Sequence, residues 1–225
     1  MNPVLFLHDV HAVIGEREFD FEDAVRDEYG PAVAEDGARL LWYLHATHGA
    51  GEAYKIITVT AVPDGAAWER LVHRLRRGDL ADWSARVDAM RYGSTSSLLV
   101  QTDWSPLGAI DLDEVPGAAG PEREVVVLRE DTVRGVDLLE SPVPAHAGDT
   151  GGDDVLSCVA AFTPALGADG SLRVLYRVAP REQWTAAFGA DHGWGDWSGS
   201  VTPALPEGAC LTSRMLRTTS WSPLA

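Results

Sequence analysis

The sequence contains the same short strings twice, about half a chain length apart. Trp-Ser-Pro-Leu occurs at 104–107 and, 117 residues later, at 221–224. Asp-Trp-Ser occurs at 82–84 and, 114 residues later, at 196–198. A proline followed closely by a tryptophan, at 63 and 68, is repeated at 180 and 184. Three matches in one order at a nearly constant offset indicate a tandem duplication, so the chain should use one supersecondary unit twice.

The first copy predicts the element order strand, helix, strand, strand, helix, strand. Its opening segment has the period of a strand, with Phe6 and His8 on one face and Leu7 and His11 on the other. The middle strands flank a glycine-rich turn at 49–52, which is a hairpin signal. The expected strands are 4–13, 38–48, 53–62 and 97–103, and the expected helices are 20–35, with Asp20 as a candidate N-cap, and 66–77, followed by helical residues at 80–90. This is the split βαβ unit, an antiparallel sheet with both helices on one face.

The second copy keeps the strands but not the first helix. We expect strands at 123–133, 155–163, 172–178 and 210–220, and a helix at 181–188. The segment 134–154 contains Pro142, Pro144 and a glycine-rich run, which favour a loop where the first copy has a helix. The expected domains are therefore an N-terminal ferredoxin-like repeat at 1–107, a linker at 108–121, and a C-terminal ferredoxin-like repeat with a degraded first helix at 122–225.

A single repeat of this kind leaves one face of its sheet apolar. Strands such as 40–44 and 56–59 are apolar on both faces, as expected for a sheet that is covered on both sides. Burial of apolar surface stabilises by about 25 cal/mol per Å², which favours packing the two repeats sheet to sheet. The expected fold class is α+β, with two tandem ferredoxin-like βαββαβ repeats packed as a pseudo-dimeric α/β barrel.

Charge and composition exclude several classes of partner. The chain has 34 acidic and 18 basic residues, a formal net charge of −16, which disfavours binding to nucleic acid or to anionic membrane surfaces. No apolar run approaches the ~18 residues of a transmembrane helix, and the N-terminus lacks the pattern of a signal peptide. With two distant cysteines, Cys158 and Cys210, the expectation is a cytoplasmic protein, either a monomeric pseudo-dimer or a homodimer.

Several strings of the first copy resemble the dimeric α/β-barrel superfamily and, within it, NIPSNAP-like proteins. They are Phe-Leu-His-Asp at 6–9, Tyr-Gly-Pro at 29–31, the hairpin at 46–54, the helix with Trp68, and Trp-Ser-Pro-Leu at 104–107. The resemblance covers 3–107 well and 122–225 weakly. It implies the fold, and a range of roles: cofactor-free monooxygenases, isomerases, ring-forming enzymes, haem proteins, or proteins without a known role. None of the strings is a catalytic signature.

His8 and His45 are the candidates for chemistry among the seven histidines, because each interrupts an otherwise apolar strand. In the ferredoxin-like order the third strand separates the first from the second, which would place these histidines about 10 Å apart. That separation is too large for a shared metal but allows both to line one pocket. We expect them to act as general acid and base. The alternative is that they are core or rim histidines with satisfied hydrogen bonds.

Aromatic residues of the first copy are the candidates for substrate binding. They are Trp42, Tyr43, Tyr54, Trp68 and Tyr92, which could form the wall of an apolar cavity for a flat ligand. The alternative is that they fill the core and the helix-to-sheet interface. No metal-ligand or nucleotide-binding motif occurs, so we expect no metal and no other cofactor.

These observations lead to one functional expectation and two alternatives. The expectation is a small-molecule enzyme that catalyses cofactor-free proton transfer, as an isomerase or cyclase, or monooxygenation, on a hydrophobic substrate such as a polycyclic one. The first alternative is a non-catalytic ligand-binding or scaffold protein of the NIPSNAP-like kind. The second is a haem-binding barrel, for which only the histidines argue.

Overall fold

A computed structural model describes residues 4–47, 53–117, 120–135, 156–166, 170–178 and 210–224. The chain forms two compact units. Unit 1 comprises Met1–Val100, Ile110–Val126 and Leu216–Ala225, and unit 2 comprises Gln101–Ala109 and Val127–Met215. The expected domains follow the two sequence copies, whereas each compact unit contains the closing segment of the other copy.

The sheet of unit 1 has the strand order of a ferredoxin-like fold. Its strands are β1 (Leu5–Val13), β2 (Arg39–Ala46), β3 (Lys55–Val62) and β4 (Arg91–Gln101). They run β4-β1-β3-β2, and the pairs β4–β1, β1–β3 and β3–β2 are antiparallel. This agrees with the predicted order. The fourth strand begins earlier than predicted, directly after the second helical segment.

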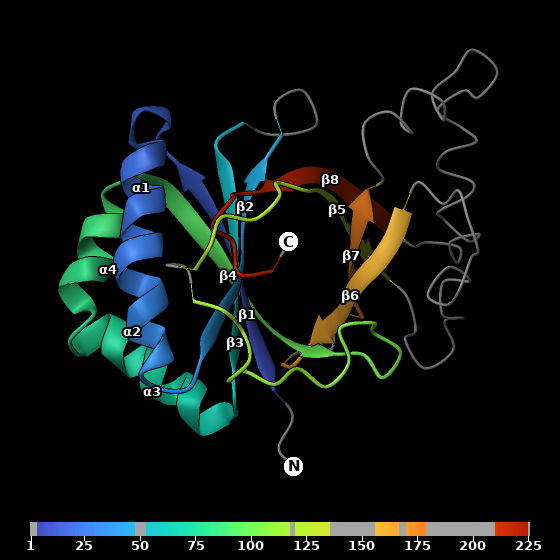
Figure 1. Cartoon of the computed structure of the whole chain (residues 1–225), viewed down its shortest axis with the longest axis horizontal. Coiled ribbons are helices and arrows are strands. Elements are labelled where there is room, and N and C mark those ends of the chain that lie inside the picture. The colour runs from blue at the N-terminus through green and yellow to red at the C-terminus, as the bar shows by residue number, and fades with distance from the viewer. Residues whose placement is uncertain are drawn as a thin grey trace. The chain divides into compact units, whose positions relative to one another are not determined.

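Helices cover one face of this sheet (Figure 1). They are a 3-10 turn (Gly15–Arg17), α1 (Glu18–Ala24), a π-helical turn (Val25–Tyr29), α2 (Gly30–Ala34), α3 (Gly65–Arg77) and α4 (Ala81–Asp88). The predicted helix at 20–35 is therefore a longer, segmented helix, and α1 begins at Glu18 after Arg17, so Asp20 is not its N-cap. The start of α3 is capped, because the Asp64 side chain accepts a hydrogen bond from Ala67 N at 2.8 Å.

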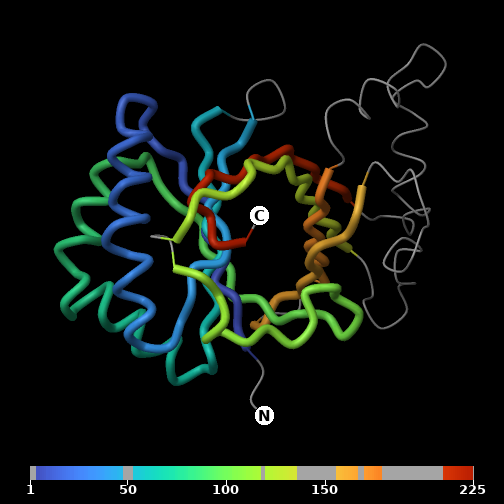
Figure 2. Tube along the Cα trace, viewed as in Figure 1, coloured from blue at the N-terminus to red at the C-terminus, as the bar shows by residue number. Residues whose placement is uncertain are grey.

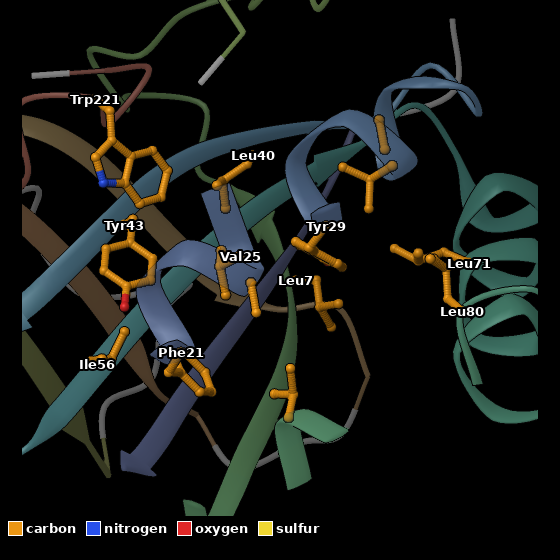
Figure 3. Close-up of a cluster of buried hydrophobic side chains, with 14 of the residues drawn as sticks. Leu7, Phe21, Val25, Tyr29, Leu40, Tyr43, Ile56, Leu71, Leu80 and Trp221 are labelled. Carbon is orange, nitrogen blue, oxygen red and sulfur yellow. The ribbon is translucent and has the colours of Figure 1, made fainter. Parts of the chain in front are cut away.

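The core of unit 1 lies between these helices and the sheet (Figure 3). Phe21 and Val25 project from the first helical segment at the spacing that puts i and i+4 on one face. Leu7 and Ile56 project from β1 and β3, and Leu71 from α3. Alternation along the strands and helical spacing thus direct apolar side chains into one layer, as the sequence predicts.

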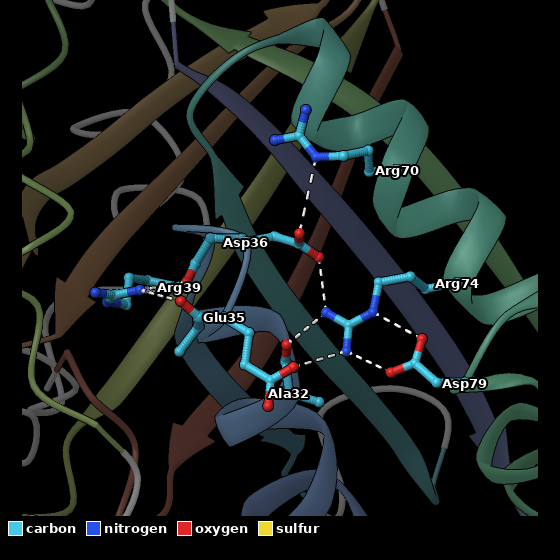
Figure 4. Close-up of polar contacts among 9 residues, drawn as sticks. Ala32, Glu35, Asp36, Arg39, Arg70, Arg74 and Asp79 are labelled. Atoms are coloured by element: carbon cyan, nitrogen blue, oxygen red, sulfur yellow. Dashed lines mark hydrogen bonds and ion pairs between the residues drawn. The ribbon is translucent and has the colours of Figure 1, made fainter.

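Arg74, near the end of α3, connects α3 with α2 and the residues that follow α2 through an ionic network (Figure 4). Its guanidinium donates to the Ala32 carbonyl oxygen at 2.8 Å, to Asp36 Oδ2 at 2.7 Å and to Glu35 Oε2 at 3.1 Å. Two further bonds go to the Asp79 carboxylate at 2.9 and 2.6 Å. The planar guanidinium can make all of these bonds at once, which a lysine ammonium cannot do.

The Arg74→Ala variant is expected to lower the free energy of unfolding by about 1–2 kcal/mol. Several carboxylates of the network are solvent-exposed, which limits the contribution of each ion pair. Arg74→Lys should lose part of this amount. Arg70 contacts Asp36 only at 3.8 Å, so Arg70→Ala is the control and should change the stability by no more than ~0.5 kcal/mol. Urea unfolding monitored by circular dichroism measures all three, and equal losses for Arg74→Ala and Arg70→Ala would contradict the prediction.

Unit 2 repeats the strand order. Its strands are β5 (Val127–Arg134), β6 (Leu156–Pro164), β7 (Leu172–Val178) and β8 (Cys210–Thr218), and they run β8-β5-β7-β6. The last residues of β8 belong to unit 1, where Leu216–Thr218 pair with Leu44–Ala46 of β2. The predicted helix at 181–188, most of the degraded segment at 134–154, and the turns at 49–52 and 167–170 lie wholly or mostly outside the described residues.

The repeated Trp-Ser-Pro-Leu segments are where the two copies exchange their ends. Segment 101–109 packs in unit 2, where Ser105 Oγ accepts a hydrogen bond from Ala161 N at 2.9 Å. Segment 216–224 packs in unit 1, where Ser222 Oγ accepts one from Tyr43 N at 3.2 Å. The C-terminal segment, red in Figure 2, accordingly lies beside β2. Each closing segment thus binds the second strand of the other copy.

Candidate functional site

The two faces of β1 carry different histidines. The ring of His11 lies 5.0 Å from that of Phe21, so His11 faces the helices. His8, three residues earlier on a regular strand, points to the opposite face, as the alternation predicts. His45 contacts Glu18 and Glu22 of α1 and therefore lies on the helix-covered face. His8 and His45 are both buried, but they do not share a face of the sheet.

His45 is held between two carboxylates of α1. Its Nδ1 lies 2.9 Å from Glu18 Oε1, and its Nε2 lies 3.1 Å from Glu22 Oε2. The two acids are four residues apart on the helix, a spacing that directs both side chains to the same side. The His45 side chain is only 7% exposed, whereas Glu18 and Glu22 are 21% and 17% exposed. We call these three residues the His45 cluster.

The His45 cluster places one imidazole between two carboxylates. A neutral imidazole has one N–H, so both carboxylate contacts are hydrogen bonds only if the ring is doubly protonated or if one glutamate carries the proton. The pKa of Glu22 is lowered: burial acts to raise it, but hydrogen bonds from His45 and Trp221 outweigh that effect. An imidazole with a carboxylate on each side is an arrangement suited to general acid–base catalysis.

Tyr43 places a free hydroxyl beside this cluster. The side chain is fully buried, and its ring centroid lies 5.3 Å from that of His45 and 4.8 Å from that of Trp221. Burial, together with the negative charges of Glu22 and Glu18, raises the pKa of Tyr43, so the phenol stays neutral. Its hydroxyl has no hydrogen-bond partner among the residues that the structure describes. Buried polar groups are normally hydrogen-bonded, so a ligand oxygen or a water is the expected partner of this hydroxyl.

A second polar group lies around His11, which we call the His11 cluster. Arg91 Nη1 bonds to Nδ1 of His11, and His11 Nε2 lies 3.1 Å from Thr58 Oγ1. A guanidinium can only donate, so Nδ1 accepts and Nε2 donates to Thr58. Burial, with the nearby charges of Arg91 and His8, lowers the pKa of His11 to about 3. His11 is therefore a neutral imidazole with a defined tautomer.

Two neighbouring residues add hydroxyl and carboxyl groups to the His11 cluster. Burial raises the pKa of Asp9, although a hydrogen bond from Ser96 and the charges of His8 and Arg91 oppose the shift. Tyr29, at the end of the π-helical turn, has its hydroxyl 3.2 Å from Thr60 Oγ1. π-helical turns occur frequently at functional sites. Through Tyr29, the π-helical turn contacts the same helix–sheet layer as the His11 cluster.

Strand register joins the two clusters into one polar stripe. Asp9 and Tyr43 both pair with Thr58 of β3, and His11 and His45 both pair with Ile56. Each row therefore runs across β1, β3 and β2 on the helix-covered face. Two strand spacings put His11 and His45 about 10 Å apart. His11 thus occupies the place relative to His45 that the sequence pattern predicts for His8.

The five predicted substrate-binding residues are dispersed. Tyr43 lies in the His45 cluster layer, and Trp68 is partly buried against the same core. Trp42 is buried on the opposite face, where it and His8 both pair with Val59. Tyr54 is exposed next to the hairpin and packs on Gly15, and Tyr92 is 81% exposed on β4. Tyr54 and Tyr92 therefore do not line the buried layer, because both side chains are exposed.

Metal binding and membrane spanning find no support in the described part of the chain. No group of three histidine, cysteine, aspartate or glutamate side chains there is placed to hold a metal ion. In the His45 cluster the carboxylates bind different ring nitrogens, so the three groups do not converge on one point. None of the described helices combines the length and the apolar character needed to cross a bilayer.

Similar solved structures define the class of fold. A candidate monooxygenase from Lactobacillus acidophilus NCFM matches with a TM-score of 0.54 and 10% identity, over 98% of this chain and 97% of that one. A candidate chlorite dismutase matches with a TM-score of 0.52 and 10% identity, over 99% and 97%. A NIPSNAP family protein from Agrobacterium tumefaciens matches 46% of this chain and 98% of its own, with 20% identity and a TM-score of 0.39.

The likeness over nearly the whole chain shows the fold. This protein has the α+β fold of the dimeric α/β-barrel proteins, with ferredoxin-like strand order in both halves, as the sequence predicted. At 10% identity the likeness shows no activity. No family model matches the sequence, and no curated protein matches it.

Proposed function

We propose that this protein is a small-molecule enzyme that transfers a proton on a hydrophobic, flat substrate and needs no metal or nucleotide. The observation that carries the proposal is the His45 cluster beside the unpartnered hydroxyl of Tyr43, in the buried helix–sheet layer of unit 1. Burial of these groups away from water strengthens their interaction with any charge that develops on a substrate.

Each group has a role that follows from its hydrogen bonds. Glu22, whose pKa is lowered, accepts a proton from an acidic C–H or O–H of the substrate, and His45, bonded to Glu22 Oε2, relays it. Tyr43, a neutral phenol, donates a hydrogen bond to the substrate oxygen on which negative charge develops. Returning the proton at another carbon gives isomerisation or ring closure.

The same carbanion can also react with molecular oxygen. Anthrone illustrates the balance: loss of one proton from its CH2 gives an anion, addition of O2 gives a hydroperoxide, and loss of water leaves anthraquinone. One O2 is consumed, and one water leaves for each substrate molecule. A protein of similar fold is described as a candidate monooxygenase, which supports the oxygenation reaction by analogy of fold.

Anthrone therefore serves as a probe for both reactions. Exchange of its CH2 protons in D2O, followed by NMR, reports proton transfer, and an oxygen electrode reports oxygenation. The His45→Gln variant keeps a polar side chain that cannot transfer a proton. It should lower the rate of whichever reaction the wild type catalyses, proton exchange or oxygen uptake, by about 100- to 10,000-fold. His73→Ala, on an exposed helix position, is the control and should keep the full rate.

His8 provides the comparison that identifies the face at which chemistry occurs. It lies on the opposite face with Trp42, where it would serve as acid or base only for a substrate bound there. His8→Ala should leave the anthrone rate near the wild-type value. If His8→Ala abolishes the rate and His45→Gln does not, the site is on the other face. If neither changes it, both histidine assignments are wrong.

The two alternative functions predict different experimental results. If the protein is a non-catalytic binding or scaffold protein, the wild type should give neither proton exchange of anthrone nor oxygen uptake, whether or not it binds anthrone. A haem-binding barrel would show a Soret band after purification with haem present. Both ring nitrogens of His11 and His45 are already bonded, so either would have to give up a hydrogen bond to become an axial ligand.

A further inference from the structure

Trp221 belongs to the second sequence copy, yet its side chain completes the His45 cluster in unit 1. Its indole Nε1 donates to Glu22 Oε1 at 2.7 Å, across 199 residues of sequence. The ring is buried beside Tyr43 (Figure 3). Glu22 therefore uses one oxygen for Trp221 and the other for His45.

The indole can orient Glu22 but cannot exchange a proton with it. An indole N–H is a donor only, so the bond persists whatever the protonation of His45. Fixing Oε1 fixes the plane of the carboxylate, and with it the direction in which Oε2 faces His45. The segment that carries Trp221 is itself anchored. Tyr43 N donates to Ser222 Oγ, and Leu224 N donates to the Leu41 carbonyl oxygen at 2.9 Å.

The equivalent contact in unit 2 has no such site beside it. Ser105 binds Ala161 N as Ser222 binds Tyr43 N, so Ala161 occupies the position of Tyr43. Two residues further along the strand, Thr163 occupies the position of His45. Trp104, the counterpart of Trp221, packs against the apolar cluster of unit 2. The tyrosine and histidine are thus present in only one of the two copies.

We infer that Trp221 is a positioning residue for the proposed site, through which the second copy supplies part of the first copy's acid–base machinery. This inference rests on the proposed function. It gives the duplication a functional meaning: unit 1 holds the reacting groups, and the exchanged C-terminal segment sets the orientation of Glu22. A repeat ending at residue 107 would lack this contact.

The test uses the full-length chain with Trp221→Phe, and Trp104→Phe as the matched control. Phenylalanine keeps an aromatic ring but removes the N–H that helps to lower the pKa of Glu22. The midpoint of the Glu22 side-chain carboxyl titration, followed by 13C NMR, should rise in Trp221→Phe and stay unchanged in Trp104→Phe. Because the reaction needs the carboxylate form, the acidic limb of the anthrone pH–rate profile should move to higher pH in the same variant.

The outcomes separate this inference from the proposed function. An unchanged Glu22 midpoint in Trp221→Phe would overturn the positioning role even if His45→Gln abolishes turnover. A raised midpoint, with full turnover in His45→Gln, would uphold the positioning role and overturn the proposed function. If Trp221→Phe does not fold, Ser222→Ala loosens the same segment while keeping the indole, and should raise the Glu22 midpoint by a smaller amount; no change there would overturn the inference.

Discussion

Replacing Phe21 with alanine is expected to lower the free energy of unfolding by about 3–5 kcal/mol. Phe21 is fully buried on α1, at the centre of the layer between helix and sheet. The centroid of its ring lies 5.0 Å from that of His11, so the ring also contacts the polar stripe. Truncation removes its apolar surface from the core and leaves a cavity that the two rigid layers cannot fill.

Phe19 is the matched control for this prediction. It lies on the same helix, two residues earlier, and is 77% exposed. Phe19→Ala should change the stability by no more than ~0.5 kcal/mol. Urea unfolding, monitored by tryptophan fluorescence and by circular dichroism, measures both variants. A loss below ~1 kcal/mol for Phe21→Ala would mean that α1 does not pack on the sheet as described, and would remove the support of the His45 cluster as well.

The Asp131→Ala variant is expected to lose about 3–5 kcal/mol for a different reason. Asp131 accepts a hydrogen bond from Arg129 Nε at 2.7 Å on β5, and both side chains are buried. Arg129 also donates to Ser213 Oγ at 3.1 Å, a bond that does not neutralise its charge. Alanine therefore removes a carboxylate partner of a buried guanidinium, and breaking a buried ion pair by removing one member is costly.

A double variant tests whether the cost comes from the loss of the pair or from the single charge that remains in Asp131→Ala. Arg129→Met with Asp131→Leu removes both charges and keeps apolar volume next to Val174 and Tyr176 of β7. Replacing a buried ion pair by apolar residues is often close to neutral, so the double variant should be clearly more stable than Asp131→Ala. If the double variant is as unstable as the single one, the ion pair itself stabilises unit 2. The measurement is again urea unfolding at constant pH.

The sequence predicted the strands and their order well, because these depend on local pattern. The alternation of Phe6 and His8 with Leu7 and His11 gave the two faces of β1 correctly. The capped and periodic segment after Pro63 became α3 within one residue of its predicted bounds. The helix starting at Glu18 was placed two residues late, because its first turn lacks a capping side chain that would mark its start.

The candidate site was predicted only in part. His45 was identified because it interrupts an apolar strand, and it does bind two acids. His11 was missed: alternation shows that His8 and His11 face apart, but not which face the helices cover. Glu18 and Glu22 were not among the predicted site residues, and Glu18 lay outside the predicted helix. Their i, i+4 spacing was the available signal, and it gains meaning only with a histidine opposite.

The duplication, the strand order and the two faces of each strand were determined by the sequence alone, since backbone geometry fixes the periods of two and 3.6 residues. The tertiary structure decided which face carries the candidate site and which copy's ending contacts it. Trp221 reaches Glu22 over 199 residues, and each closing segment binds the other copy's second strand. Such contacts follow from the packing of whole layers, which no local pattern encodes.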